Sequence, residues 1–143
     1  MAAEEKNDQE LLSKAIGAMS NVYVPYSRFP VGAALLCADG TVITGGNIEN
    51  SSYGATICAE RSAVVRALAE GHREFKAIAV ATELKEPASP CGICRQVLVE
   101  FGDFKVIMGS SKSDKKIITT TYGLLPYAFT QKSLDDFAAQ TKA

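Results

Sequence analysis

The chain has 143 residues, of which 47% are hydrophobic and 22% charged, and its formal net charge at pH 7 is -1. This composition is typical of a globular protein, and the length fits one domain with its own core, so we expect a single domain over residues 1–143 with loose termini at about 1–8 and 138–143. The slightly negative charge argues against a nucleic-acid partner, whose binding needs clustered Lys and Arg. The polar start and the lack of a long apolar run indicate a cytoplasmic protein with no membrane partner.

The first part of the chain predicts a helix followed by a hairpin. Asn7 or Asp8 is the expected cap of an amphipathic helix whose apolar residues recur at helical spacing: Leu11, Leu12, Ala15, Ile16 and Met19. Residues 31–37 and 41–48 are rich in strand-forming residues, and Asp39-Gly40 between them is a strong hairpin signal.

The rest of the chain alternates helices and strands. Residues 58–70 predict a second helix that ends at a glycine, and residues 76–82 predict an apolar strand. A loop with two prolines then leads to a third helix that begins at Cys91 and ends near residues 101–102. Two strands over 105–108 and 117–120 and a short helix over 133–140 complete the chain. These elements predict a three-layer α/β/α fold.

Three of the four cysteines have the spacing of a catalytic zinc site. Cys58 stands two places before Glu60, and residues 90–94 read Pro-Cys-Gly-Ile-Cys, so Cys91 and Cys94 form a Cys-x-x-Cys pair. Three thiolate ligands leave the fourth tetrahedral position open to water. Glu60 is placed to act beside the metal as a general acid and base without binding it.

The expected helix starts place these thiolates in a favourable field. Cys58 is expected in the first turn of the second helix, and Cys91 and Cys94 in the first turn of the third, where the helix dipole is positive. Three thiolates on Zn²⁺ nevertheless leave a charge of about -1. Arg61 is the candidate that offsets this charge, with Arg95 as a second donor.

Taken together, these motifs resemble the cytidine deaminase family, in particular its small, three-cysteine, homotetrameric, nucleoside-acting members. The resemblance runs from about Tyr26 to Phe129 and is carried by residues 25–35, 46–50, 58–61 and 124–126, with Tyr53. It implies a cytidine-deaminase-like fold with a mixed five-stranded sheet and one Zn²⁺ per subunit. It also implies hydrolysis of cytidine and deoxycytidine to uridine and deoxyuridine with release of ammonia, as in pyrimidine salvage.

The resemblance also assigns residues to the substrate. It implies that Asn47 and Glu49 bind ribose hydroxyls and that Phe29 packs against the nucleoside. Backbone groups near Ala59 and Ser89 are expected to orient the amino group, and Arg61 to hydrogen-bond the ligand sulfurs. Tyr53 and Phe129 are expected to enter the pocket of a neighbouring subunit.

Other interpretations remain open at the level of sequence. Cys37 could complete a closed, structural four-cysteine site, although its place at the end of an apolar strand favours a buried small side chain. A nucleic-acid-editing deaminase would share the metal chemistry but should carry a basic groove. A deaminase of a cytosine-containing antibiotic would share the Cys-Ala-Glu and Pro-Cys-x-x-Cys motifs, but residues 47–50 favour a nucleoside substrate.

Overall fold

The computed structural model describes residues 2–142, which form one mixed five-stranded sheet of order β2-β1-β3-β4-β5. The strands are β1 (Val31–Cys37), β2 (Val42–Gly46), β3 (Phe75–Thr82), β4 (Lys105–Ser110) and β5 (Ile117–Thr120). β1 runs antiparallel to both β2 and β3, β3 and β4 are parallel, and β5 is antiparallel to β4. The predicted mixed sheet is therefore confirmed.

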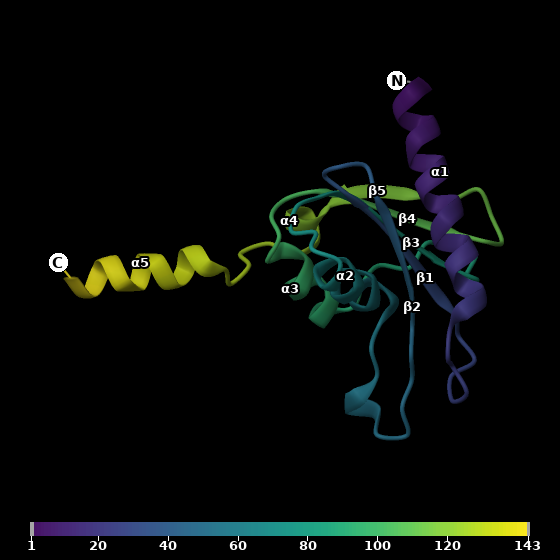
Figure 1. Ribbon diagram of the computed structural model, residues 1–143, viewed down its shortest axis with the longest axis horizontal. Coiled ribbons are helices and arrows are strands. Elements are labelled where there is room, and N and C mark those ends of the chain that lie inside the picture. The colour runs from purple at the N-terminus through teal and green to yellow at the C-terminus, as the bar shows by residue number, and fades with distance from the viewer. Residues whose placement is uncertain (1, 143) are drawn as a thin grey trace.

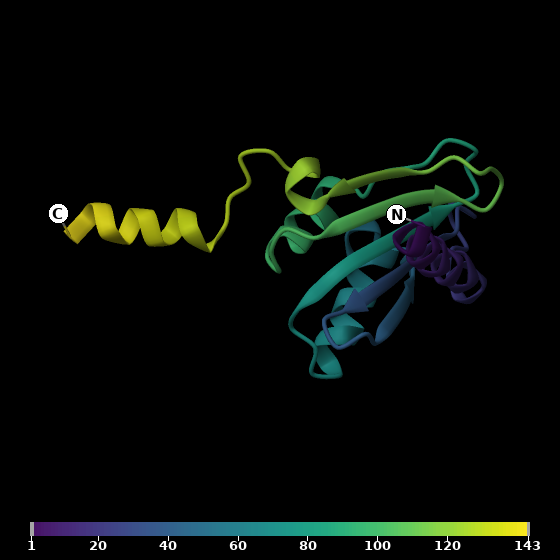
Figure 2. The same ribbon diagram turned by 90° about the horizontal axis from the view of Figure 1, so that it is seen from above.

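Helices cover both faces of this sheet (Figures 1 and 2). The helices of residues 2–142 are α1 (Ala2–Ala18), α2 (Ala59–Ala69), α3 (Gly92–Val99), α4 (Thr121–Leu124) and α5 (Gln131–Lys142), with two 3-10 turns, η1 (Met19–Asn21) and η2 (Tyr53–Ala55), and α5 alone does not pack on the sheet. Leu11 and Leu12 of α1 pack with Ala34 on one face, whereas Ala63 and Val64 of α2 pack with Leu35 on the other. Because neighbouring residues of β1 point to opposite faces, the sheet is the middle of three layers, as predicted.

The start of the chain differs from the prediction. Asn7 and Asp8 do not cap α1 but lie inside it, and residues 2–8, which we expected to be loose, are helical. The reason is a charge partner from a distant strand: Lys105 Nζ lies 3.2 Å from the buried carboxylate of Asp8 and also contacts Glu4. Met1 and Ala143 lie outside the described residues.

The end of the chain also differs. α5 is longer than the expected 133–140 helix, and Figure 1 shows it standing away from the three layers. None of its residues is buried within the single chain. Among residues 2–142, no helix is both long and apolar enough to cross a membrane.

Two glycines explain how the site is brought together. Gly40 has φ +92 in the turn of the predicted hairpin, where Asp39 Oδ1 accepts a hydrogen bond from Thr41 N at 2.9 Å. Gly45 on β2 faces α2 so closely that a Cβ there would lie 2.5 Å from Ala63 N and 2.7 Å from Ala59 O. The absence of a side chain at Gly45 therefore lets the first turn of α2 lie directly on the sheet.

Candidate active site

The three cysteines of the predicted metal site lie together at two helix starts. Cys58 precedes α2 and Cys91 precedes α3 as N-cap residues, while Cys94 lies in the first turn of α3. Cys58 and Cys91 thus lie just before the first turns in which they were expected, whereas Cys94 lies in the first turn as predicted. All three Sγ atoms lie within 4.8 Å of one another, and those of Cys58 and Cys91 are 3.8 Å apart.

This geometry fits zinc. Sulfurs of a tetrahedral site with Zn–S bonds of about 2.3 Å lie roughly 3.8 Å apart, which matches the Cys58–Cys91 separation. Cys37 is fully buried in the core between the sheet and α2, as expected for a small apolar side chain, and it is not in the thiol group found among residues 2–142. The donor set therefore leaves a fourth position open, and a closed four-cysteine site is not formed.

Arg61 lies beside these sulfurs. Its Nη2 atom is 3.4 Å from Cys58 Sγ and 3.5 Å from the carbonyl oxygen of Thr56. The nearby Cys94 thiol, together with Arg61 and Cys91, lowers the pKa of the Cys58 thiol to about 5. The interaction with Cys58 and burial raise the pKa of the Cys94 thiol.

Glu60 lies in the first turn of α2 and is only 4% exposed. Its burial is the main cause that raises the pKa of its carboxyl group, and the negative charge of Cys58 adds to this. A carboxyl group held near a metal site with a raised pKa suits a proton carrier.

A cavity of about 190 Å³ joins Glu60 to the thiols and to several residues that the sequence singled out. Six of the predicted site residues, from α2 and the segments next to β1, β2 and α3, lie around it: Phe29, Asn47, Cys58, Ala59, Glu60 and Cys91. Ser89 also lines it. The structure thus brings the candidate metal centre and part of the expected substrate site into one cavity.

Asn47 has a role that its sequence position did not reveal. Its Oδ1 accepts from Val31 N at 3.0 Å, and its Nδ2 donates to the carbonyl oxygen of Phe29 at 2.9 Å. Asn47 therefore fixes the backbone on both sides of Pro30, and with it the position of Phe29 in the cavity wall.

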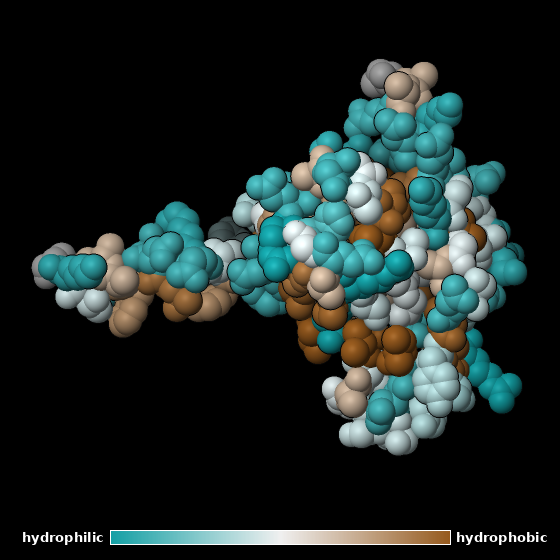
Figure 3. Space-filling model, in the orientation of Figure 1, coloured by the Kyte–Doolittle hydropathy of each residue, from teal (hydrophilic) through white to brown (hydrophobic). Residues whose placement is uncertain are grey.

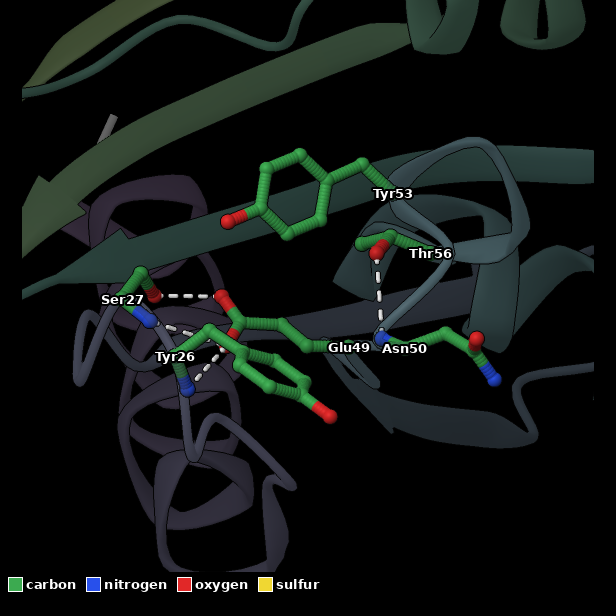
Figure 4. A pocket seen from close by; sticks show the side chains of 6 residues that line it. All are labelled: Tyr26, Ser27, Glu49, Asn50, Tyr53 and Thr56. Carbon is green, nitrogen blue, oxygen red and sulfur yellow. Dashed lines mark hydrogen bonds between the residues drawn. The ribbon is translucent and has the colours of Figure 1, made fainter.

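Glu49 and Tyr53 line a second, neighbouring cavity of about 440 Å³ (Figure 4). Glu49 accepts hydrogen bonds at 3.0 Å from the backbone N–H groups of Tyr26 and Ser27, and another from the Ser27 hydroxyl. These bonds, led by that from the hydroxyl, lower the pKa of the Glu49 carboxyl group. Thr56 lines both cavities, so Glu49 lies next to the inner cavity but not in it.

The remaining predicted residues are more exposed. Tyr53 is 78% exposed, with its ring edge-on to Tyr26, and Phe129 is 62% exposed and lines neither cavity. The prediction for Arg95 is wrong, because its side chain donates not to sulfur but to oxygen atoms of Ser89, Pro90 and Leu124. No signal in the sequence connects Arg95 with Leu124, whose contact depends on the path of the chain after β5.

Comparisons with known proteins agree with this site. Residues 5–110 match the family model described as the cytidine and deoxycytidylate deaminase zinc-binding region. A cytidine deaminase from Halalkalibacterium halodurans is 52% identical over 130 residues, which cover 90% of this chain and 98% of that protein. A cytidine deaminase from Sporosarcina psychrophila is 48% identical over 134 residues, which cover 92% and 98% of the two chains. The crystal structure of a cytidine deaminase from Burkholderia pseudomallei is similar with a TM-score of 0.82 and 45% identity, covering 85% of this chain and 98% of the other.

Proposed function

The chain belongs to the family of cytidine and deoxycytidylate deaminases, and we propose from this that it hydrolyses cytidine and deoxycytidine to uridine and deoxyuridine with release of ammonia. The observation that carries the proposal is the group of three thiols, within 4.8 Å of one another, beside a cavity that also holds a buried glutamate. We assign Cys58, Cys91 and Cys94 as the ligands of one Zn²⁺ per subunit. When bound, zinc supplies a Lewis acid that lowers the pKa of a water in its open position.

Glu60 is the proton carrier of the proposed reaction. It accepts one proton of the attacking water and delivers it to ring N3, which becomes more susceptible to attack at C4. The C4–O bond forms, and Glu60 then transfers the second proton of that water to the amino group. The C4–N bond breaks, ammonia leaves, and the N3 proton stays on the uridine product. The low exposure of Glu60 keeps bulk water from competing with these transfers.

The two cavities suggest where each part of the nucleoside binds. The inner cavity, about 190 Å³, is smaller than the roughly 300–1,000 Å³ of pockets for drug-sized ligands, so it suits a single base. Phe29 offers that base a ring face, and backbone groups near Ala59 and Ser89 orient its amino group. Because Thr56 lines both cavities, the sugar extends toward Glu49, whose carboxylate accepts from a hydroxyl. Asn47 fixes the position of Phe29 in the wall of the inner cavity.

The assembly and the cellular setting are proposed from the same features. Tyr53 remains 78% exposed although it lines the outer cavity, and the exposed Phe129 lines neither cavity, which supports a homotetramer in which both side chains meet a neighbouring subunit. A group of three free thiols suits a reducing compartment, which supports a single-domain cytoplasmic enzyme of pyrimidine salvage.

Substrate comparison tests the proposal. The zinc-loaded chain should deaminate cytidine and deoxycytidine with comparable kcat/KM, measured by loss of absorbance and by release of ammonia. Free cytosine lacks the sugar hydroxyl and should react more slowly by up to about 10⁴-fold. Removal of zinc with a chelator should abolish turnover, and added zinc should restore it.

Two further substrates separate the competing interpretations. Cytidine monophosphate should react poorly, because residues 2–142 place no glycine-rich phosphate-binding loop beside the two cavities. A cytosine-containing antibiotic should also be a poor substrate. A kcat/KM for cytosine or the antibiotic equal to that for cytidine would contradict the proposed nucleoside specificity.

A further inference from the structure

Arg95 on α3 connects three separate points around the metal site. Each of its side-chain nitrogens donates one hydrogen bond: Nε to the carbonyl oxygen of Pro90 at 2.8 Å, Nη1 to that of Leu124 at 2.9 Å and Nη2 to Ser89 Oγ at 2.7 Å. A guanidinium is planar and fixes the directions of its donors, so these three oxygens are held in one geometry.

Two of the residues that Arg95 binds, Ser89 and Pro90, form the end of the loop that leads to Cys91. Residues 87–90 belong to no helix or strand, and Pro90 has no backbone N–H of its own. Within the described part of the chain, no other side chain donates a hydrogen bond to an oxygen atom of residues 87–91. Cys91 is also the most exposed of the three thiols, whereas Cys94 is fully buried. Packing of the buried Pro90 and the backbone bond from Arg95 N to Cys91 O at 3.0 Å hold Cys91 at the start of α3, and the Arg95 side chain adds the hydrogen bonds that fix the loop before it.

The other residue that Arg95 binds, Leu124, begins the segment 124–129, which ends at Phe129. Arg95 binds the carbonyl oxygen of Leu124 at one end, and the next residue of α3, Gln96, donates to that of Phe129 at 2.8 Å at the other. Between them, Tyr127 is fully exposed and has φ 56, a conformation that aromatic residues rarely adopt. The shape of this segment is not favoured locally, so it depends on its two ends being held.

We infer that Arg95 is a positioning residue that fixes the ligand Cys91, the cavity wall at Ser89 and the start of segment 124–129. Gln96 fixes only the end of that segment. The two neighbouring side chains therefore have different roles, because Arg95 acts on the metal site and on the segment, whereas Gln96 acts on the segment alone. The consequence for turnover rests on the proposed function, but the consequence for metal binding does not.

Zinc affinity measured on the full chain, by competition with a chromogenic chelator, tests the first half of this inference. Arg95→Ala should weaken zinc binding by about 10–100-fold, the range seen when groups that orient metal ligands are removed. Arg95→Lys should lie between the parent and Arg95→Ala, because an ammonium cannot reach all three oxygens at once.

Arg73→Ala is the matched control. Arg73 also binds backbone carbonyl oxygens, those of Leu68 and His72 at 2.8 and 2.9 Å, but it lies before β3 and lines no cavity with the thiols. Its removal should leave zinc affinity unchanged. Parental zinc affinity in Arg95→Ala or Arg95→Lys, or an equal loss in Arg73→Ala, would overturn the inference. If Arg95→Ala is not recovered folded, Arg95→Lys alone decides it.

Gln96→Ala tests the difference between the two roles. It should keep zinc affinity within about twofold of the parent and raise the KM for cytidine while kcat stays near its parental value. The assignment would be overturned if Gln96→Ala weakened zinc binding as much as Arg95→Ala does. It would also be overturned if the KM for cytidine were parental in both Gln96→Ala and Arg95→Ala. A parent chain that binds zinc without deaminating cytidine would instead contradict the proposed function, and the zinc measurements would still decide the role of Arg95.

Discussion

Glu60 is a buried carboxyl group next to three thiols, a place that stability alone does not favour. It is 4% exposed, and burial followed by the charge of Cys58 raises its pKa. Taking a carboxylate out of water costs free energy unless strong partners compensate for it. A group kept in such a place, on the wall of a cavity, is more readily explained by chemistry than by folding.

Glu60→Gln should separate metal binding from turnover. The amide has nearly the same shape but cannot carry protons, so kcat should fall by about 10²–10⁴-fold while the zinc content stays at that of the parent. The free energy of unfolding should stay the same or rise, because a neutral amide is easier to bury. Cytidine turnover, metal analysis and urea denaturation of the same preparation check this. Turnover within tenfold of the parent at full zinc content would contradict the proposed role.

Asn47→Ala should act mainly on stability. The substitution leaves Val31 N–H and the Phe29 carbonyl without their partners, and each of these part-buried hydrogen bonds contributes about 0.5–1.5 kcal/mol. We expect a lower midpoint of urea denaturation together with a higher KM for cytidine. Asn50→Ala, which removes one exposed hydrogen bond in the same segment, from Ser52 N at 2.8 Å, is the comparison for stability. Unchanged stability with a higher KM would contradict this expectation and show that the two hydrogen bonds of Asn47 serve substrate binding rather than stability.

The sequence predicts the parts of the site whose partners are close along the chain. Cys91 and Cys94 are three residues apart and Glu60 follows Cys58 by two, so a helix start is enough to place them near one another. The partners of Glu49 lie more than twenty residues away, and those of Arg95 include Leu124 at a separation of 29 residues. Such contacts depend on how the loops fold, which no local pattern encodes.

At the level of elements, the contact between α2 and β2 places Cys58 and Glu60. α2 reaches the sheet because Gly45 has no side chain, and its first turn carries Glu60 into the cavity wall. The position of Cys58 and Glu60 is therefore set by a strand residue that lines neither cavity.

Gly45→Ala should disturb both stability and the site. The added Cβ would meet backbone atoms of α2 at 2.5 and 2.7 Å, so the helix must shift. Overpacking of this kind costs about 1–3 kcal/mol. We expect a lower free energy of unfolding and weaker zinc binding, because Cys58 moves with the helix. Gly17→Ala in α1 is the control, since nothing lies within 4 Å of its Cβ position. Equal stability of the two variants would contradict the expectation.

The elements themselves were predictable to different degrees. The hairpin of β1 and β2 and the strand β5 follow from their turn and β-branched residues, and they agree with the prediction closely. α1 begins earlier than the apolar pattern indicates, because Glu4 and Asp8 in its first turns form ion pairs with Lys105 on β4. The extent of α5 could not be inferred from a core contact, because it makes none within the chain.

At the scale of the whole molecule, large apolar side chains remain uncovered. Tyr53 and Phe129 are mostly exposed, and Figure 3 shows hydrophobic residues along one side of α5, where Leu134 and Phe137 are 48% and 62% exposed. Exposed apolar residues in such number are typical of a surface that meets another protein. They agree with the proposed homotetramer.

Dilution should therefore reduce activity. If neighbouring subunits complete one another's sites, specific activity should fall over the same concentration range in which sedimentation shows dissociation. Phe129→Ala should raise the KM for cytidine without weakening the isolated chain, because its side chain is mostly exposed there. A fully active monomer at assay concentration would contradict the shared sites.

The order of the metal ligands along the chain has a consequence for biosynthesis. All three thiols lie within residues 58–94, and the crossover helix α3 that carries Cys94 precedes β4 and β5. When the chain has emerged from the ribosome as far as α3, the ligand set is complete, while the last two strands have not yet emerged. The nascent chain thus exposes its thiols to zinc, or to an oxidant, before the sheet that later buries Cys94 has been finished.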